Sequence, residues 1–137
     1  MTRNLKAPSP IYFSATLSST FITTKSSDIL VYNNVITNKG NGYNPSNGTF
    51  VCPRDGTYLI AYSVLNKRQN TLHAYLRING SDKIKAVARG DHTFTSAERV
   101  SIHELRKGDQ VNVIVSEQGS QVFGYSFSNF AATYIPG

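Results

Sequence analysis

The chain has 137 residues, of which 39% are hydrophobic and 16% charged, a composition that fits one globular domain and excludes a disordered segment. Its formal net charge is +6 at pH 7, but the Lys and Arg residues stand singly or in pairs, so the charge indicates a solvated basic surface and disfavours nucleic-acid binding. A single cysteine excludes intrachain disulfides, and no apolar run reaches the length of a membrane span.

Short strands between turn signals follow one another along the chain. Residues 1–10 lack the apolar region of a signal peptide, and we expect them to be a flexible segment before a single domain, residues 11–137. In chain order, strands are expected at residues 11–17, 28–37, 49–51, 56–65, 71–78, 83–88, 97–105, 110–116 and 128–135. No segment keeps a helical period, so about ten short strands predict an all-β, antiparallel sandwich of the jelly-roll kind.

Two of these strands are apolar on both faces. In 56–65, Tyr58 and Tyr62 lie on one face, while Leu59, Ala61 and Leu65 lie on the other. In 128–135, Phe130, Ala132 and Tyr134 oppose Ala131, Thr133 and Ile135. A sandwich strand normally buries one face and exposes the other, so the second face predicts contact with another copy of the chain. We expect Tyr58, Tyr62, Phe130 and Tyr134 at that contact; the alternative is a few exposed tyrosines.

The stretch GTFVCPRDGTYLI, residues 48–60, holds the lone cysteine beside a proline turn. Cys52 is interpreted as a small buried hydrophobic residue rather than as a nucleophile. The chain has no His or Cys pairs at metal-ligand spacing, no Gly-x-Ser-x-Gly elbow and no phosphate-binding P-loop. These observations predict a protein that is not an enzyme and that needs no cofactor.

Strand direction places three loops together. If consecutive strands run antiparallel, the loops 66–70, 89–96 and 117–127 share one end of the sandwich, and the turns 79–82 and 106–109 share the other. The candidate ligand-binding residues at the first end are Lys67, Arg68, Arg89, Asp91, His92 and Tyr125. Basic groups beside an aromatic ring suit an acidic or hydroxylated ligand such as a sugar, although loop ends are polar in most proteins.

The tripeptide Arg89-Gly90-Asp91 lies in the second of these loops. Arg-Gly-Asp in an exposed loop is an adhesion motif for integrins, but the same three residues also make an ordinary turn. Both interpretations stay open, with the turn favoured.

Several segments taken together resemble the C1q globular-head family, whose members are relatives of the tumour necrosis factor jelly roll. The matching segments are YFSATLS (12–18), VYNNVITNKGNGYNPSNGTFVCPRDGTYLIAYSVL (31–65), LRKGDQVNV (105–113) and NFAATYIPG (129–137). The chain departs from the family pattern at Ala132, where a glycine is expected, and it contains no collagen-like Gly-X-Y stretch.

This resemblance implies a secreted homotrimer that binds ligands rather than catalyses a reaction. We therefore expect an extracellular recognition protein that binds carbohydrate or other anionic ligands on microbial or cell surfaces, as innate immune pattern recognition requires. The alternative is an adhesion or signalling ligand for an integrin or another protein receptor. Related heads can bind calcium near the trimer axis, but the loops here offer only Asp91 and Glu117 as carboxylates, so the metal question stays open.

Overall fold

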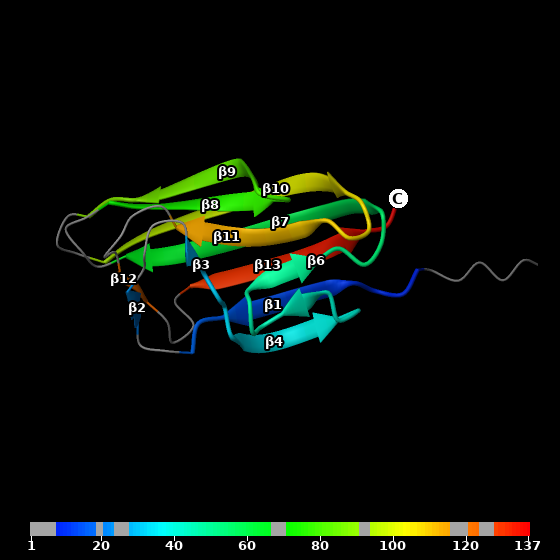
Figure 1. Ribbon diagram of the computed structural model, residues 1–137, viewed down its shortest axis with the longest axis horizontal. Coiled ribbons are helices and arrows are strands. Elements are labelled where there is room, and N and C mark those ends of the chain that lie inside the picture. Colours follow the sequence, from blue (N-terminus) through cyan, green and yellow to red (C-terminus); the bar gives the residue numbers. More distant parts are fainter. Residues whose placement is uncertain are drawn as a thin grey trace, which may run out of the picture.

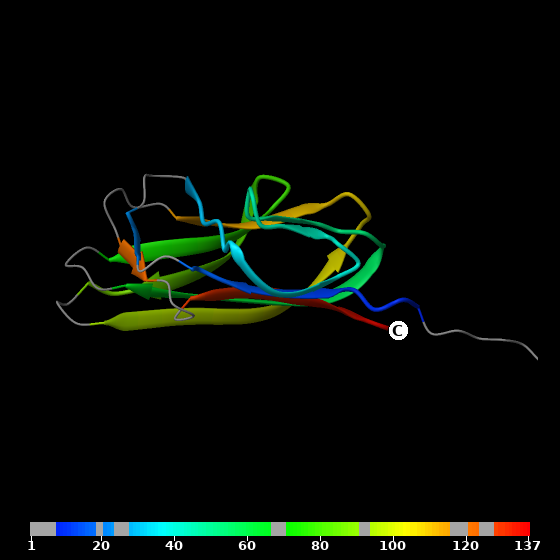
Figure 2. The ribbon, with the colours of Figure 1, turned by 90° about the horizontal axis from the view of Figure 1, so that it is seen from below.

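Two antiparallel sheets packed face to face form the structure (Figure 1), and Figure 2 shows the two layers edge-on. The structure is a computed structural model and describes residues 8–18, 21–23, 28–66, 71–90, 94–115, 121–123 and 128–137. Among these residues there is no helix long and apolar enough to cross a membrane.

The larger sheet, sheet A, contains in spatial order β2 (Phe21–Thr23), β12 (Gln121–Phe123), β7 (Gly56–Asn66), β13 (Asn129–Ile135), β1 (Tyr12–Thr16) and β4 (Asn34–Lys39), with β10 (Thr95–Leu105) paired to β7. The smaller sheet, sheet B, contains β5 (Tyr43–Asn44), β6 (Thr49–Val51), β11 (Gln110–Val115), β8 (Leu72–Ile78) and β9 (Ser81–Ala88), with β3 (Asp28–Ile29) paired to β11. The predicted antiparallel jelly-roll sandwich is confirmed.

The run 28–37, predicted as one strand, is divided between the sheets. β3 pairs with β11 in sheet B, whereas β4 pairs with β1 in sheet A. Between them Leu30 and Tyr32 are fully buried, and the Asn33 side chain exchanges hydrogen bonds with Ser18. The chain crosses from one sheet to the other here because its two apolar side chains fill the space between the sheets.

Three further strands, β2, β5 and β12, were not predicted from the sequence. β5 lies within 38–48, which was expected to be a loop, and β12 lies within the predicted loop 117–127. β12 pairs with β2 over three residues. Strands of two or three residues show too little alternation to be recognised from sequence, and only their partners in the sheet define them.

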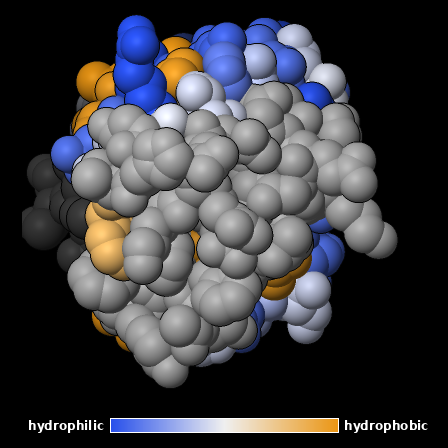
Figure 3. Space-filling model, turned by 90° about the vertical axis from the view of Figure 1, so that its left-hand side faces the viewer, coloured by the Kyte–Doolittle hydropathy of each residue, from blue (hydrophilic) through white to orange (hydrophobic). Residues whose placement is uncertain are grey.

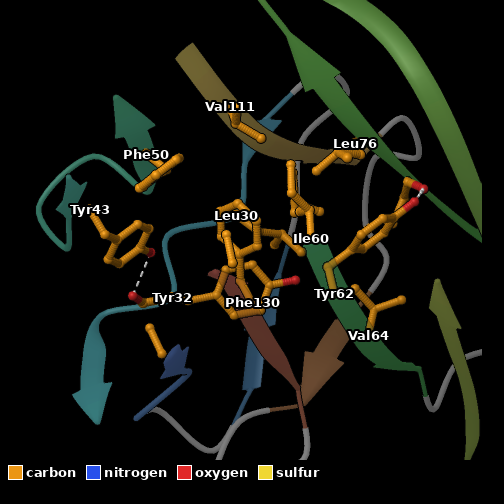
Figure 4. Packing of buried hydrophobic residues seen from close by; sticks show 14 of the residues in the cluster. Leu30, Tyr32, Tyr43, Phe50, Ile60, Tyr62, Val64, Leu76, Val111 and Phe130 are labelled. Atoms are coloured by element: carbon orange, nitrogen blue, oxygen red, sulfur yellow. Dashed lines mark hydrogen bonds between the residues drawn. The ribbon is translucent and has the colours of Figure 1, made fainter. Parts of the chain in front are cut away.

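Aromatic side chains, among them Tyr43, Phe50 and Phe130, fill one part of the core (Figure 4). The Phe13 ring stacks on Tyr43 with 4.4 Å between ring centroids, and Phe130 meets Phe13 edge-on at 4.9 Å. Phe50 adds a further contact to Phe13 at 5.1 Å. These rings come from β1, β5, β6 and β13, so the cluster joins the two sheets.

Hydrogen bonds from buried tyrosine hydroxyls fix the position of the two packed sheets relative to each other. The Tyr62 hydroxyl, on sheet A, donates to the Ala74 carbonyl oxygen on sheet B at 2.9 Å, and the Tyr43 hydroxyl donates to the Tyr32 carbonyl oxygen at 2.6 Å (Figure 4). The Tyr32 hydroxyl donates to the Ser63 carbonyl oxygen at 3.1 Å. Burial raises the pKa of Tyr62 to about 12, so the hydroxyl keeps its proton and remains a donor.

The expected contact residues Tyr58, Tyr62 and Phe130 belong instead to this core. They are exposed by 0%, 1% and 0%, and side chains with no accessible surface have none left to bury against a second copy. The prediction for these three residues was wrong, because the doubly apolar pattern of β7 and β13 does not say which face turns inward. Tyr134 is partly buried, with its ring edge-on to Tyr58 at 5.4 Å, and its place at a contact stays a prediction.

Cys52 is fully buried beside the turn that precedes β7. Its thiol donates to the Arg54 carbonyl oxygen at 3.0 Å, and the Tyr58 hydroxyl donates to the same oxygen at 2.8 Å. Backbone hydrogen bonds join Cys52 to Gly108 and Asp109 in the turn after β10. The cysteine therefore fits a confined position that links two turns, as a small hydrophobic side chain should.

We predict that Gly48→Ala destabilises the fold much more than Gly80→Ala. Both glycines have left-handed backbones, with φ of +73° and +79°, so an alanine at either position is strained by about 1 kcal/mol. A Cβ at Gly48 would also lie 2.6 Å from the Leu30 carbonyl oxygen, whereas nothing lies within 4 Å at Gly80. Urea unfolding at a fixed protein concentration should give a loss on the order of 3 kcal/mol for Gly48→Ala. Equal losses would show that the Gly48 contact is unimportant.

Candidate assembly face and loop end

The outer face of sheet A is apolar at its centre. The register aligns Ala131 of β13 with Ala61 of β7, and Thr133 with Leu59, so these four side chains share the face opposite the core. All four are partly buried in the single chain. The alternation expected for 56–65 and 128–135 is thus present, and its second apolar face is the one that carries Leu59, Ala61, Ala131 and Thr133.

This face contains a shallow hollow of about 280 Å³. Its lining residues are Tyr12, Phe13, Ser14, Thr37, Leu59, Ala61, Ala131, Ala132 and Thr133. None of these residues carries a charge. The side chains in the middle of the face are small, so the surface is hollowed there. A hollow of this kind can accept a larger apolar side chain from another molecule.

Strand β10 continues the apolar face toward the edge of sheet A. Val100 lies opposite Ala61 and Ile102 lies opposite Leu59 in the β10–β7 register. Each of the two β10 side chains is 62% exposed. Exposed β-branched residues beside an uncharged hollow form a contiguous apolar patch, which is typical of a surface that binds another protein chain.

The strands that flank the three predicted loops end close to one another. Asn66, at the end of β7, pairs with Thr95 at the start of β10, and its side-chain amide donates to the Ala88 carbonyl oxygen at 3.2 Å. The Ser128 hydroxyl, just before β13, accepts a hydrogen bond from the Leu65 backbone at 3.0 Å. These strand ends lie at the left of Figure 1, and Figure 3 faces that end, with hydrophilic atoms along much of its described upper rim.

Of the six candidate ligand-binding residues, the structure describes one. Arg89 follows β9 directly and is exposed. Lys67, Arg68, Asp91, His92 and Tyr125 lie outside the described residues, so the Arg-Gly-Asp tripeptide is described only in part. The roles of all six residues therefore stay predictions.

The described residues contain no group of three or more His, Cys, Asp or Glu side chains that could hold a metal ion. Asp91 and Glu117, the carboxylates considered for calcium, lie outside that part of the chain. The question of calcium at the loop end therefore stays open.

A side-chain network closes the opposite end of the sandwich. The Asn79 amide nitrogen donates to Asp109 Oδ1 at 2.9 Å, and Asp109 Oδ2 accepts from the Arg106 backbone at 2.8 Å. These hydrogen bonds hold the pKa of Asp109 below its usual range, with the Arg106 backbone as the main cause. The network joins the two predicted turns and marks this end as structural.

His103 on β10 has surroundings that the sequence patterns did not predict. Its ring Nε2 lies 2.7 Å from the Ser101 hydroxyl. Partial burial, and secondarily the positive charge of Lys83, lower the pKa of His103 below its ordinary value. Packing of β9, in sheet B, against β10, in sheet A, brings Lys83 near His103, and sequence spacing gives no sign of that.

Comparison with solved structures defines the class of domain. The globular domain of zebrafish complement 1qA protein matches with a TM-score of 0.75 and 13% identity, covering 91% of this chain and 97% of that one. Eiger TNF from S. frugiperda matches with a TM-score of 0.80 and 9% identity, covering 93% of each chain. At these identities the likeness concerns the fold, which is a jelly roll of the C1q and TNF type.

The family follows from the sequence itself. The profile of the C1q domain matches residues 12–132, and the chain belongs to the C1q domain family. It is 29% identical over 105 residues to the heavy metal-binding protein HIP of Mytilus edulis, covering 76% of this chain and 49% of that protein. It is also 29% identical over 94 residues to a chain of the complement C1q subcomponent of Mus musculus, covering 66% of this chain and 36% of that protein. The chain thus spans half or less of these relatives.

Family membership carries general expectations for function. Domains of the C1q and TNF type are generally ligand-binding modules without catalytic activity, and they typically form trimers that bind proteins or other ligands. Proteins with a C1q domain are typically secreted.

We predict that His103 makes the fold less stable as the pH falls through about 6.5. The pKa of His103 is lower in the folded chain than in the unfolded chain, so the unfolded state binds the proton more readily. Acidification therefore stabilises the unfolded state relative to the folded state. The melting temperature of the wild type should therefore fall more between pH 7.5 and 5.5 than that of His103→Gln. Identical pH profiles would mean that the histidine is not perturbed by folding.

Proposed function

We propose that this protein is a secreted C1q-domain recognition protein that assembles as a homotrimer and binds carbohydrate or other anionic ligands on microbial or cell surfaces. Its activity would be lectin-like recognition in innate immunity, without catalysis. The observation that carries the proposal is the C1q domain match over residues 12–132, because domains of this family are generally ligand-binding modules.

The outer face of sheet A supports self-association as the mode of assembly. It offers an uncharged hollow of about 280 Å³ next to two side chains, Val100 and Ile102, that are each 62% exposed. Leaving such a patch in water costs free energy at roughly 25 cal/mol per Å² of apolar surface, which burial against a second copy recovers. Three copies joined by this face would present three identical loop ends, and weak single sites then gain avidity.

The loop end supports the ligand assignment. At this end Asn66 of β7 pairs with Thr95 of β10 and its side-chain amide donates to the Ala88 carbonyl oxygen, so the strands next to the predicted loops 66–70 and 89–96 end side by side. In the proposal these loops and the loop 117–127 supply the ligand contacts Lys67, Arg68, Arg89, Asp91, His92 and Tyr125. Cationic groups favour carboxylates, sulfates and phosphates, and an aromatic ring offers a face to a pyranose. The alternative, a receptor or integrin ligand, would use Arg89-Gly90-Asp91 in the same segment.

We predict that Ala131→Glu disrupts assembly. A carboxylate at the centre of the apolar face would be buried without a partner when two copies meet, at a cost of several kcal/mol. Light scattering should give the wild type a mass about three times the 15.1 kDa of the chain and should shift the variant toward one chain mass. Val51→Glu is the matched control, since Val51 is 42% exposed on sheet B and should leave the mass unchanged. A wild type of a single chain mass would contradict the trimer.

We predict that Lys67→Ala combined with Arg68→Ala weakens ligand binding while the trimer is retained. The assay is a screen against microbial polysaccharides and acidic glycans, with affinity measured for the best ligand. Binding should also weaken as salt rises, because surface charges are screened over about 10 Å at 0.1 M.

The control for this variant is Lys39→Ala combined with Lys107→Ala, which removes the same charge from exposed positions elsewhere. Equal losses from both variants would mean diffuse attraction rather than a site at the loop end. No binding to any glycan would remove the lectin proposal and favour a protein receptor.

A further inference from the structure

The register between β10 and β7 places the acidic and the basic side chains of β10 on opposite faces of the strand. Glu98 and Glu104 lie opposite Ser63 and Thr57 of β7, on the outer face of sheet A. The other set, Arg99, Ser101 and His103, lies opposite Tyr62, Ile60 and Tyr58, on the face turned toward sheet B. The acidic and the basic side chains of this strand therefore lie on opposite faces.

The cationic face of β10 meets β9, the last strand of sheet B. Both strands run along the same edge of the sandwich (Figure 1), and Arg99 Nη1 donates to the Lys85 carbonyl oxygen at 2.7 Å. Lys83 lies close enough to His103 for its charge to lower the pKa of that ring. Lys83, Lys85, Arg99 and His103 thus lie on the two strands where the edges of the sheets adjoin, and this set is here called the basic seam.

The cations of the basic seam lack carboxylate partners within the described part of the chain. The ion pair in this region joins Arg77 to Asp82 at 2.8 Å, and Lys83, Lys85 and Arg99 take no part in it. Lys83 and Lys85 are exposed, so their charges face solvent. Like charges held close together without counter-charges oppose folding, and such an arrangement suits a surface that receives an anion from outside.

The length of the basic seam matches a polymer better than a single small anion. Arg99 and His103 are four residues apart on one strand, a separation of about 13 Å at roughly 3.3 Å per residue. Because its pKa is lowered, His103 is largely neutral at pH 7, but Lys83 lies beside it, so the charges of Arg99 and Lys83 are separated by a similar distance. The seam also leads to the loop end, because β9 ends at Ala88, directly before Arg89. An extended ligand bound at the loop end would therefore lie along these cations.

We propose that the basic seam is a binding track for acidic polysaccharide, with Lys83, Lys85 and Arg99 contacting successive sulfate or carboxylate groups. This inference rests on the proposed recognition of carbohydrate or anionic ligands and extends the site from the loop end down the β9–β10 edge. The Tyr75 ring, 5.5 Å from Lys85 Nζ and only partly buried, supplies an apolar surface beside the charges for a sugar ring.

The test compares two double variants of the full chain that lower the net charge equally. Lys83→Gln with Lys85→Gln alters the seam, and Lys39→Gln with Lys107→Gln alters exposed lysines elsewhere. The probes are a heparin decasaccharide and a decamer of polygalacturonate, with neutral dextran of similar size as the control ligand. Binding of the first probe tests for contacts with sulfate groups, and binding of the second tests for contacts with carboxylate groups alone.

The seam variant should lose about tenfold in affinity for at least one acidic probe, since two surface contacts of about 0.7 kcal/mol each amount to a factor of ten. The control variant should lose less than about twofold, and both should keep the melting temperature and oligomeric mass of the wild type. Binding of the acidic probes should exceed binding of dextran.

Four results would overturn the basic seam. Equal losses from the two variants would indicate diffuse charge attraction, and stronger binding to single-stranded DNA than to either acidic probe would indicate another class of ligand. Binding of neutral glycans alone would remove the seam but leave the proposed function in place. Failure to bind any polysaccharide would remove both.

Discussion

The in-and-out alternation of β7 is the constraint on which the rest of the structure depends. This strand pairs with β13 on one edge and with β10 on the other, so its register sets which side chains of three strands face inward. Tyr58, Ile60, Tyr62 and Val64 point into the core and are almost wholly buried. A shift by one residue would place the tyrosines outside and Leu59 and Ala61 inside, and would lose the hydroxyl bond from Tyr62 to sheet B.

The same alternation creates the outer surface. With the large rings inside, the centre of sheet A presents alanine, threonine and leucine to the exterior, and this gives the uncharged hollow that we propose is covered by a second copy. On β10 it also separates glutamates from basic residues, which leaves the cations at the seam with sheet B. The register of β7 with β13 and β10 therefore determines which side chains form the core, which form the outer face of sheet A, and which lie at the basic seam.

Much of the fold could be predicted from the sequence, since the long strands alternate clearly and the turns contain Asn, Gly and Asp. Strands β2, β5 and β12 were missed because two or three residues show no period, and the crossing at Leu30 and Tyr32 looked like continuous strand. Three of the four expected interface residues, Tyr58, Tyr62 and Phe130, were misassigned for a different reason. Both faces of β7 and β13 are apolar, and only packing against sheet B decides that Tyr62 and Phe130 are inside. Likewise, the nearness of Lys83 and His103 depends on a contact between sheets that sequence spacing does not encode.

The central claim is that the face carrying Leu59, Ala61, Ala131 and Thr133 is covered by another copy of the chain. The most direct measurement is the thiol-labelling rate of an Ala61→Cys variant, since the native Cys52 is fully buried. The account predicts slow labelling when Ala61→Cys is the only change and fast labelling when Ala131→Glu is added, with a Val51→Cys variant labelled at one rate in both backgrounds. Fast labelling of Ala61→Cys in both backgrounds would contradict the account.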